Sequence, residues 1–345
     1  MIVDYLLTSL ILLALLSVVF YGSKRVPNDT FFMSKSYGVL MKGVCAIIVV
    51  LFHVPLNYQN PLQHFLGGYA FVAVTLFFLF SSYGMLFNVE HTPSYLHYFW
   101  KKRLFSLLCP VLIVNLVFFV FQFLLFRKSN LRILLHVDEY VVVLLQYCLL
   151  FYIANYFGRT KILRYNWQVD VLLILGVLVS SLFILFGLQS NAPSGENDWY
   201  VERYGLIWGL LLYRYFLKLI QWFNILRNLK IILVFIVSIL SLAAYHSFKL
   251  YGIGYRYVFE ILSALFIILL VFLLTQKRFF GNRISVLLGG ISYEIYLSHR
   301  YVMELVVNIC PSLSSGFFIL LVVLVTTLVS YFAHSICKRL LKHFK

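Results

Sequence analysis

Residues 42–53 read KGVCAIIVVLFH, an apolar run with a cation, Lys42, at one end and a histidine, His53, at the other. Eleven residues separate the two, which is close to three turns of an α-helix at about 100° per residue. In a helix both side chains therefore lie on one face, about 16 Å apart along the axis. Because a histidine inside an apolar helix is costly, we expect it to face a protein interior or a cavity.

The helix face between these two side chains carries the small or slender residues Cys45, Ala46 and Val49. Either a neighbouring helix or a thin ligand can approach such a face closely. A neutral imidazole accepts a proton, which suits His53 to act as a general base on a hydroxyl. The alternative is a histidine whose hydrogen bonds are satisfied in the core and which takes no part in chemistry.

The composition places the chain among membrane proteins. Of its 345 residues, 62% are hydrophobic and only 12% are charged, with a mean hydropathy of +0.93. Runs of about 20 apolar residues, long enough to cross a bilayer as helices, recur along the whole length. We therefore predict an all-α, polytopic bundle of transmembrane helices. The eleven expected spans are roughly 2–21, 38–56, 65–87, 104–126, 139–157, 169–188, 203–220, 230–247, 255–275, 285–308 and 314–336.

The positions of the basic residues fit this count. If the N-terminus is outside, the segments on the inner side hold 21 of the 28 Lys and Arg residues, as cytoplasmic loops generally do. We therefore expect a multi-pass protein of the plasma membrane with its N-terminus outside and its C-terminus cytoplasmic. The net charge of +16 is explained by topology, and no nucleic-acid partner is expected.

Several other classes of site have no signature here. The five cysteines show no paired spacing, so the sequence indicates neither a disulfide framework nor a zinc site, and no metal is expected. Gly-x-Ser-x-Gly, His-Glu-x-x-His and Walker motifs are absent from the sequence. The first segment lacks the basic start and the cleavage site of a signal peptide, so we interpret it as a retained helix.

A second histidine, His299, lies in the outer half of span 285–308, as His53 does in its own span. Ser292, Tyr296 and His299 share one helix face, and Glu294 points away from it. Further polar residues are expected in the same outer layer: Glu202, Arg203, Arg256, Glu260, Arg300 and Glu304. If the spans converge, these groups line one polar cavity. The alternative is that Arg256–Glu260 and Arg300–Glu304 are ion pairs that hold helices together.

Four stretches in a fixed order resemble the motifs of the acyltransferase-3 family, the bacterial membrane O-acyltransferases of polysaccharides. They are Lys42-Gly43 with His53, FFLFSSYG at 77–84, FWKKR at 99–103 followed by Pro110, and SYEIYLSH at 292–299. The resemblance covers roughly residues 38–336. It departs from the family pattern at Lys42, where arginine is usual, at Ser82, which replaces a glycine, and at Leu107, which replaces an arginine.

The resemblance implies a ten-helix core, so the chain divides into an extra N-terminal helix and loop, 1–36, and a membrane acyltransferase domain, 37–345. It implies transfer of an acetyl group from cytoplasmic acetyl-CoA, a substrate and not a permanently bound cofactor, to a hydroxyl of a cell-surface or lipid-linked glycan. His53 is the expected general base.

The other residues receive three expected roles. Lys42, Lys101, Lys102 and Arg103 are expected to bind the phosphates of coenzyme A. Ser81, Tyr83, Tyr296 and His299 are expected to orient His53 or to donate a hydrogen bond to the developing oxyanion. Glu202, Arg203, Arg256 and Glu260 form the expected acceptor-side polar cluster.

Two other functions are consistent with the bulk features of the sequence. A transporter or flippase for a lipid-linked or anionic solute uses buried His, Glu and Arg as a proton relay or a substrate path. However, the two halves of the chain show no matching pair of interrupted helices. A structural membrane subunit is the remaining alternative, and it predicts that loss of His53 is harmless.

Overall fold

The structure, a computed structural model, describes residues 2–26, 31–127, 130–159, 166–191, 200–248 and 251–343. These residues are almost wholly helical, which confirms the predicted all-α class. The α-helices are α1 (Ile2–Phe20), α2 (Lys35–Phe52), α3 (Pro61–Gly67), α4 (Ala70–His91), α5 (Phe99–Phe126), α6 (Glu139–Arg159), α7 (Asn166–Asn191), α8 (Tyr204–Arg214), α9 (Phe216–Asn224), α10 (Arg227–Phe248), α11 (Ile253–Thr275), α12 (Arg283–Gly290), α13 (Ser292–Ile309) and α14 (Ser315–His343). The remaining elements are two 3-10 helices, η1 (Leu56–Tyr58) and η2 (Leu131–Leu135), and an antiparallel pair of two-residue strands, β1 (Lys24–Arg25) and β2 (Arg278–Phe279).

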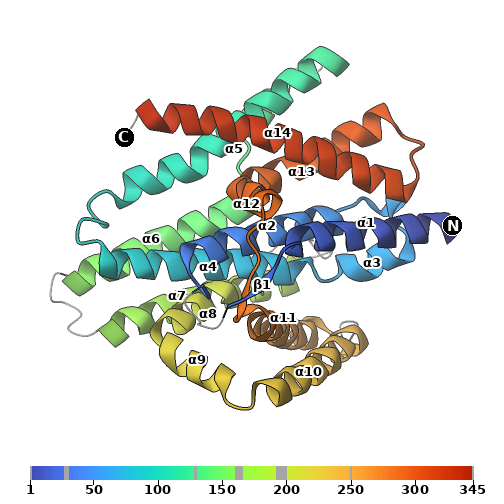
Figure 1. Ribbon diagram of the computed structural model, residues 1–345. Helices are drawn as coiled ribbons and strands as arrows, with labels where there is room; N and C mark the ends of the chain where they lie inside the picture. Colours follow the sequence, from blue (N-terminus) through green and yellow to red (C-terminus); the bar gives the residue numbers. More distant parts are fainter. Residues whose placement is uncertain are drawn as a thin grey trace.

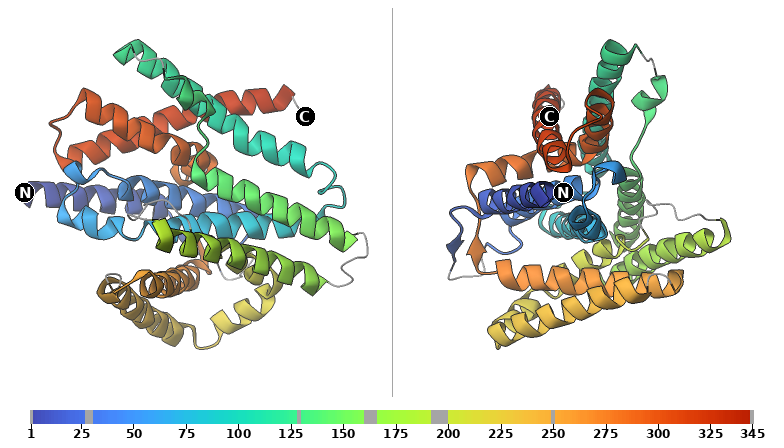
Figure 2. Two further views of the ribbon diagram at one scale, coloured as in Figure 1. Left: turned by 180° about the vertical axis from the view of Figure 1, so that it is seen from behind. Right: turned by 90° about the vertical axis from the view of Figure 1, so that its right-hand side faces the viewer.

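The helices lie in three tiers (Figure 1, Figure 2). The middle tier holds α1, α2, α4 and α6, with α5, α13 and α14 on one side and α9, α10 and α11 on the other. Helix α2 contacts α4, α12 and α13, and α4 in turn packs along α8. The helix that carries Lys42, and that ends directly before His53, is therefore at the centre of the bundle.

Eight helical segments of the described residues are long and apolar enough to cross a membrane. They correspond to α2, α4, α5, η2 with α6, α7, α10, α11 and α14. Most of them leave a large part of their apolar surface uncovered by protein, as helices in contact with lipid do. The chain is therefore a multi-pass membrane protein.

Three of the eleven predicted spans are not single helices. Span 65–87 begins in α3 and continues in α4, with a break at Gly68 and Tyr69. Span 203–220 is divided at Tyr215 into α8 and α9, and span 285–308 is divided at Ile291 into α12 and α13. With 11 residues, α8 rises about 16 Å, roughly half of the hydrocarbon thickness of a bilayer. The prediction that 203–220 crosses the membrane as one helix is therefore wrong.

Glycines allow the central helices to approach closely. A Cβ atom on Gly205 or Gly209 of α8 would lie 2.1 or 2.3 Å from backbone oxygens of α4. A Cβ atom on Gly43 of α2 would lie 2.6 Å from the backbone nitrogen of Gly289 in α12. Since apolar burial gives little drive for helix association in lipid, such small-residue contacts are a main source of helix packing there.

The N-terminal helix α1 packs against α12 and α14. The amide of Asn60, which lies before α3, donates a hydrogen bond to the hydroxyl of Thr8 at 2.9 Å, and both side chains are buried. Such contacts join α1 to the bundle. The division of the chain into 1–36 and 37–345 stays a prediction from the family resemblance.

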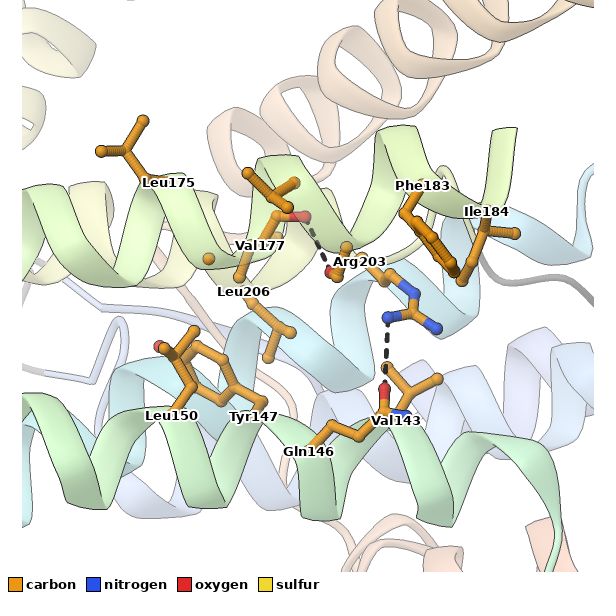
Figure 3. Close-up of a pocket in the computed structure, with 13 residues that line it drawn as sticks. Val143, Gln146, Tyr147, Leu150, Leu175, Val177, Phe183, Ile184, Arg203 and Leu206 are labelled. Atoms are coloured by element: carbon orange, nitrogen blue, oxygen red, sulfur yellow. Dashed lines mark hydrogen bonds between the residues drawn. The ribbon is translucent and has the colours of Figure 1, made fainter. Parts of the chain in front are cut away.

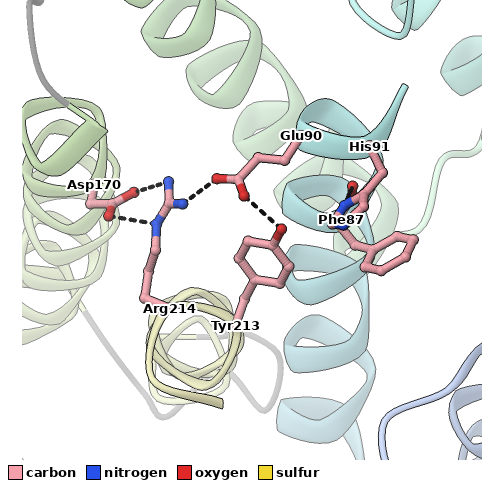
Figure 4. Close-up of polar contacts among 6 residues, drawn as sticks. All are labelled: Phe87, Glu90, His91, Asp170, Tyr213 and Arg214. Atoms are coloured by element: carbon pink, nitrogen blue, oxygen red, sulfur yellow. Dashed lines mark hydrogen bonds and ion pairs between the residues drawn. The ribbon is translucent and has the colours of Figure 1, made fainter. Parts of the chain in front are cut away.

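A polar network joins three helices at the end of α8 that is remote from Arg203 (Figure 4). The guanidinium of Arg214 donates to both carboxylate oxygens of Asp170 on α7, at 2.7 and 2.9 Å. It also pairs with Glu90 on α4, which accepts a further bond of 2.7 Å from Tyr213. One arginine thereby holds α4, α7 and α8 together.

We predict that Gly205→Ala destabilises the protein although alanine is the better helix former. The lost close contact costs about 1–3 kcal/mol, which exceeds the gain of about 1 kcal/mol in helix propensity. Gly254→Ala on α11 is the control, because its Cβ meets no atom within 4 Å. The measurement is the thermal unfolding midpoint in detergent. An unchanged midpoint for Gly205→Ala would contradict the close packing of α8 on α4.

We also predict that Arg214→Ala lowers the unfolding midpoint by several degrees. The side chains of Arg214 and Asp170 are 21% and 16% exposed, so we expect a cost of about 2 kcal/mol, between those of exposed and buried ion pairs. Lys218→Ala removes the same charge from an exposed position on α9 and is expected to have little effect. Equal unfolding midpoints for the two variants would contradict a structural role for Arg214.

Candidate functional site

His53 lies directly after Phe52, the last residue of α2, and not inside a longer helix as predicted for span 38–56. Its Nδ1 atom is 2.8 Å from the carbonyl oxygen of Val49. Because a carbonyl oxygen only accepts hydrogen bonds, Nδ1 carries the hydrogen, and Nε2 of the neutral ring carries the lone pair. The ring is half-buried. In this geometry, His53 can accept a proton at Nε2.

The second predicted histidine, His299 on α13, lies beside the first. The two ring centroids are 5.0 Å apart, with the planes inclined at 70°. His299 is buried, and its Nδ1 is 2.5 Å from the carbonyl oxygen of Tyr296, so it has the same tautomer as His53. Its Nε2 makes no hydrogen bond to the described residues. A buried acceptor of this kind is unusual and points to a ligand.

Aromatic and hydroxyl side chains build the wall behind His299. The Tyr296 ring packs on His299 at 5.7 Å and on Tyr140 of α6 at 4.8 Å. The Tyr296 hydroxyl donates to Asp138 at 3.0 Å. Ser81 donates to a carbonyl one turn earlier in α4, at 2.8 Å, and also contacts the Tyr140 hydroxyl. The hydroxyl protons of Tyr296 and Ser81 are therefore donated to acceptors other than His53.

Asp138 is a member of this site that the sequence patterns do not single out. Its carboxylate accepts from the backbone N–H of Tyr140 at 2.9 Å, capping α6, as well as from the Tyr296 hydroxyl. An Asp directly before an apolar helix is a usual N-cap signal, but that signal says nothing of a contact with α13. Tyr83, by contrast, packs on Tyr213 of α8, with the ring centroids 5.5 Å apart.

At the other end of the Lys42–His53 segment, two cations come together. Lys42 is half-buried and close enough to Arg103 of α5 for the two charges to repel each other. Arg103 donates to the Tyr95 hydroxyl at 3.2 Å, and neither cation has a carboxylate partner among the described residues. Lys101 and Lys102 are exposed. Of the four predicted phosphate ligands, the structure gathers Lys42 and Arg103.

The helix face between Lys42 and His53 is closed. Cys45, Ala46 and Val49 are at most 1% exposed, because α2 is packed by α4, α12 and α13. The sequence predicted that either a neighbouring helix or a thin ligand approaches this face. The structure shows neighbouring helices there, and they leave no room for a ligand.

The predicted acceptor-side residues fall into two groups. Arg256 and Glu260 on α11 form an ion pair with Nε and Oε2 3.5 Å apart. Glu202 lies near this pair, and burial together with the Glu260 carboxylate raises the pKa of Glu202. Arg203 instead donates a hydrogen bond of 3.3 Å to Gln146 on α6 and lines a cavity between α6 and α7.

The expectation that all outer polar groups line one cavity is wrong. Glu304 lines a separate cavity of about 220 Å³ between α5 and α13, together with Gln122 and Asn308. Glu294, predicted to point away from the histidine face, does so: it is buried and pairs with His334 of α14 at 2.9 Å. This contact links two helices and lies apart from the histidine pair.

Comparison with known proteins assigns the chain to a protein family. No curated protein and no solved structure matches it. A family model described as an acyltransferase domain, that of the acyltransferase-3 family, matches residues 39–334. The matched region includes Lys42, His53, Arg103 and His299, and it covers most of the chain. The chain therefore belongs to the acyltransferase-3 family and is a membrane acyltransferase.

Proposed function

We propose that the chain transfers an acyl group, acetyl in the simplest case, from acyl-CoA to a hydroxyl of a cell-surface or lipid-linked glycan. The observation that carries this proposal is the pair of His53, which is half-buried, and His299, which is buried, side by side in an acyltransferase domain with their lone pairs on Nε2. We place the enzyme in the plasma membrane, with its N-terminus outside and its C-terminus in the cytoplasm, following the distribution of basic residues.

In the proposed reaction, Nε2 of His53 removes the proton of the acceptor hydroxyl while the hydroxyl oxygen attacks the thioester carbonyl. The carbon–sulfur bond then breaks, an ester forms, and the proton passes from His53 to the departing thiolate of coenzyme A. Nδ1 keeps its hydrogen bond to Val49 throughout, which fixes the ring and its tautomer.

We assign His299 to the binding of the acceptor sugar. Its buried Nε2 is an acceptor atom without a hydrogen bond to the described residues, and a sugar offers several hydroxyl donors. We infer that one of these hydroxyls donates to His299 while its neighbour reacts at His53. Tyr296 and Ser81 act as positioning residues that hold His299 and the α4–α6 wall in place.

Lys42 and Arg103 form the proposed donor site. These two cations have no carboxylate partner among the described residues and repel each other, and an anion between them relieves that repulsion. The phosphates of coenzyme A supply such an anion, and charge-assisted hydrogen bonds to Lys and Arg are the usual way proteins bind phosphate. Lys101 and Lys102, exposed at the start of α5, add attraction at longer range.

Donor and acceptor sites lie at opposite ends of a closed helix face. About 16 Å separates Lys42 from His53 along the axis, and the side chains between them are buried. The acyl-pantetheine arm therefore requires α2 to separate from a neighbouring helix before the thioester reaches His53. The family match disfavours the transporter alternative, because that alternative provides no acyl chemistry.

We predict that His53→Ala abolishes acyl transfer while the protein still folds. The assay follows release of CoA from radiolabelled acetyl-CoA and label on the glycan of native membranes. His91→Ala is the matched control: His91 also ends a helix with Nδ1 on the carbonyl four residues earlier, at 2.9 Å, but it is exposed (Figure 4). Full transfer by a correctly folded His53→Ala variant would exclude His53 as the base.

A second prediction concerns the donor. Lys42→Ala is expected to raise the apparent KM for acetyl-CoA about tenfold, the effect of one lost hydrogen bond to a charged group, and Lys42→Arg is expected to keep most of the activity. Lys35→Ala, at an exposed position on the same helix, is the control. If KM stays the same in Lys42→Ala and only kcat falls, Lys42 does not bind the donor.

A further inference from the structure

The cavity of about 220 Å³ between α5 and α13 lies near the membrane surface on the side of His53. Gly289 of α12 contacts Gly43 of α2, and His299 of α13 lies beside His53 after the end of α2. The segment through α12 and α13 therefore runs in the same direction as α2. The residues of α13 that line the cavity fall in 301–308, beyond His299 and close to the end of the helix.

The cavity is on the face of α13 opposite His299. At about 100° per residue, Tyr301, Glu304 and Asn308 are turned by between about 140° and about 200° from His299 around the helix axis. At about 1.5 Å per residue, Asn308 is also about 14 Å farther along that axis. A glycan chain whose reacting sugar lies at His299 must therefore pass around the end of α13 to reach the cavity, and this takes several sugar units.

Three polar side chains in the walls of this cavity can bind a ligand. Gln122 of α5 and both Glu304 and Asn308 of α13 line the cavity, and these side chains make no hydrogen bond or ion pair with another described residue. Glu304 and Asn308 are exposed, and an exposed carboxylate at the end of a helix is in contact with water and not with lipid. The two amides offer hydrogen-bond donors and acceptors, and the carboxylate accepts.

Aromatic rings form much of the remaining wall. Phe118 stacks on Tyr301 with the ring centroids 4.9 Å apart, and Phe121 packs on Phe118 at 6.0 Å. The Tyr301 hydroxyl donates to the amide oxygen of Asn115 at 3.3 Å, which holds its ring in place. Flat apolar rings beside amide and carboxylate groups match a sugar, which has apolar C–H faces and hydroxyl groups at its edges. The volume is below the range of about 300–1,000 Å³ that is usual for drug-sized ligands, so it suits one sugar ring.

Other classes of ligand fit these walls less well. None of the lining residues is Lys or Arg, and the carboxylate of Glu304 repels phosphate and other anions. The cavity of about 630 Å³ between α6 and α7 has mostly apolar walls (Figure 3). The smaller cavity instead has polar groups on both of its helices, and an acyl chain would leave these groups without hydrogen bonds.

We propose that the cavity between α5 and α13 binds one uncharged sugar unit of the acceptor glycan, several units away from the sugar that is acylated. The amides of Gln122 and Asn308 and the carboxylate of Glu304 bind its hydroxyl groups, and the aromatic rings contact its C–H face. The inference rests on the proposed function, because that function supplies the glycan. A long glycan chain then binds the enzyme at two places, whereas a short fragment that reacts at His53 binds at one.

The test compares long and short acceptors. Unacylated glycan from cells that lack the protein is used as long chains or as fragments of one repeat unit, with radiolabelled acetyl-CoA as the donor. The double variant Gln122→Met/Asn308→Leu removes both amides at nearly constant volume. We expect it to raise the apparent KM for long chains at least about tenfold, the effect of two lost hydrogen bonds, and to leave kcat and the KM for fragments unchanged. Asn228→Leu, the same change at an exposed position on α10, is the control and is expected to alter neither KM.

A second variant and a binding measurement complete the test. Asn308→Trp fills the cavity and is expected to raise the same KM even if the double variant fails to fold. Equilibrium dialysis of the long chains without acetyl-CoA measures binding alone, and we expect binding to Asn308→Trp to be about tenfold weaker than to the wild type. If the wild type transfers no label, the proposed function fails, and the dialysis still tests the sugar site.

Three results would overturn the sugar site. The first is that the wild type binds no glycan, or that folded Asn308→Trp binds long chains as tightly as the wild type. The second is that the KM for fragments rises as much as the KM for long chains. The third is that Glu304→Gln, which keeps a hydrogen-bond acceptor, weakens binding more than the double variant does, because that result indicates a cationic ligand.

Discussion

Close contacts between helix backbones at a few glycines determine where the side chains of the candidate site lie. Gly43 places α2 directly against α12 at Gly289, and Gly205 and Gly209 bring α8 onto α4. In lipid, where apolar burial gives little drive for helix association, this close approach is a main source of packing. Because Lys42 is on α2 and His53 follows it directly, the position of that helix determines where the proposed donor site and the proposed acceptor site both lie.

Most buried polar side chains in the bundle serve this packing and not the chemistry. Tyr37 bonds Thr275 at 2.6 Å, and Ser298 bonds Ser330 at 2.9 Å, each across two helices. In an apolar medium such groups must find partners, so a satisfied polar residue by itself indicates little about function. Nε2 of His299 differs because it is buried and bonds none of the described residues. In the proposed function, that difference, more than burial itself, is the reason for assigning the reaction to the histidine pair.

The sequence predicts the helical class and the multi-pass topology, because hydropathy and helical periodicity carry that information. The expectation that His299 lies close to His53 comes from the resemblance to the acyltransferase-3 family. The sequence does not predict the breaks at Tyr215 and Ile291, which interrupt runs that stay apolar. The contact of Asp138 with Tyr296 joins residues that are distant in the sequence, and no local pattern reports such a contact. For the same reason the sequence places Lys101 and Lys102 with Lys42, although α5 turns them to solvent.

The central claim is that one helix connects a donor site on one side of the membrane with a reaction centre near the other. The most direct measurement uses sealed vesicles of known orientation that contain the native glycan, with radiolabelled acetyl-CoA, which does not cross the bilayer, supplied on one side. The account predicts label on glycan at the opposite face, and only when acetyl-CoA is supplied on the side of Lys42 and Arg103. Label confined to the face that receives acetyl-CoA, or equal labelling from either side, would contradict it.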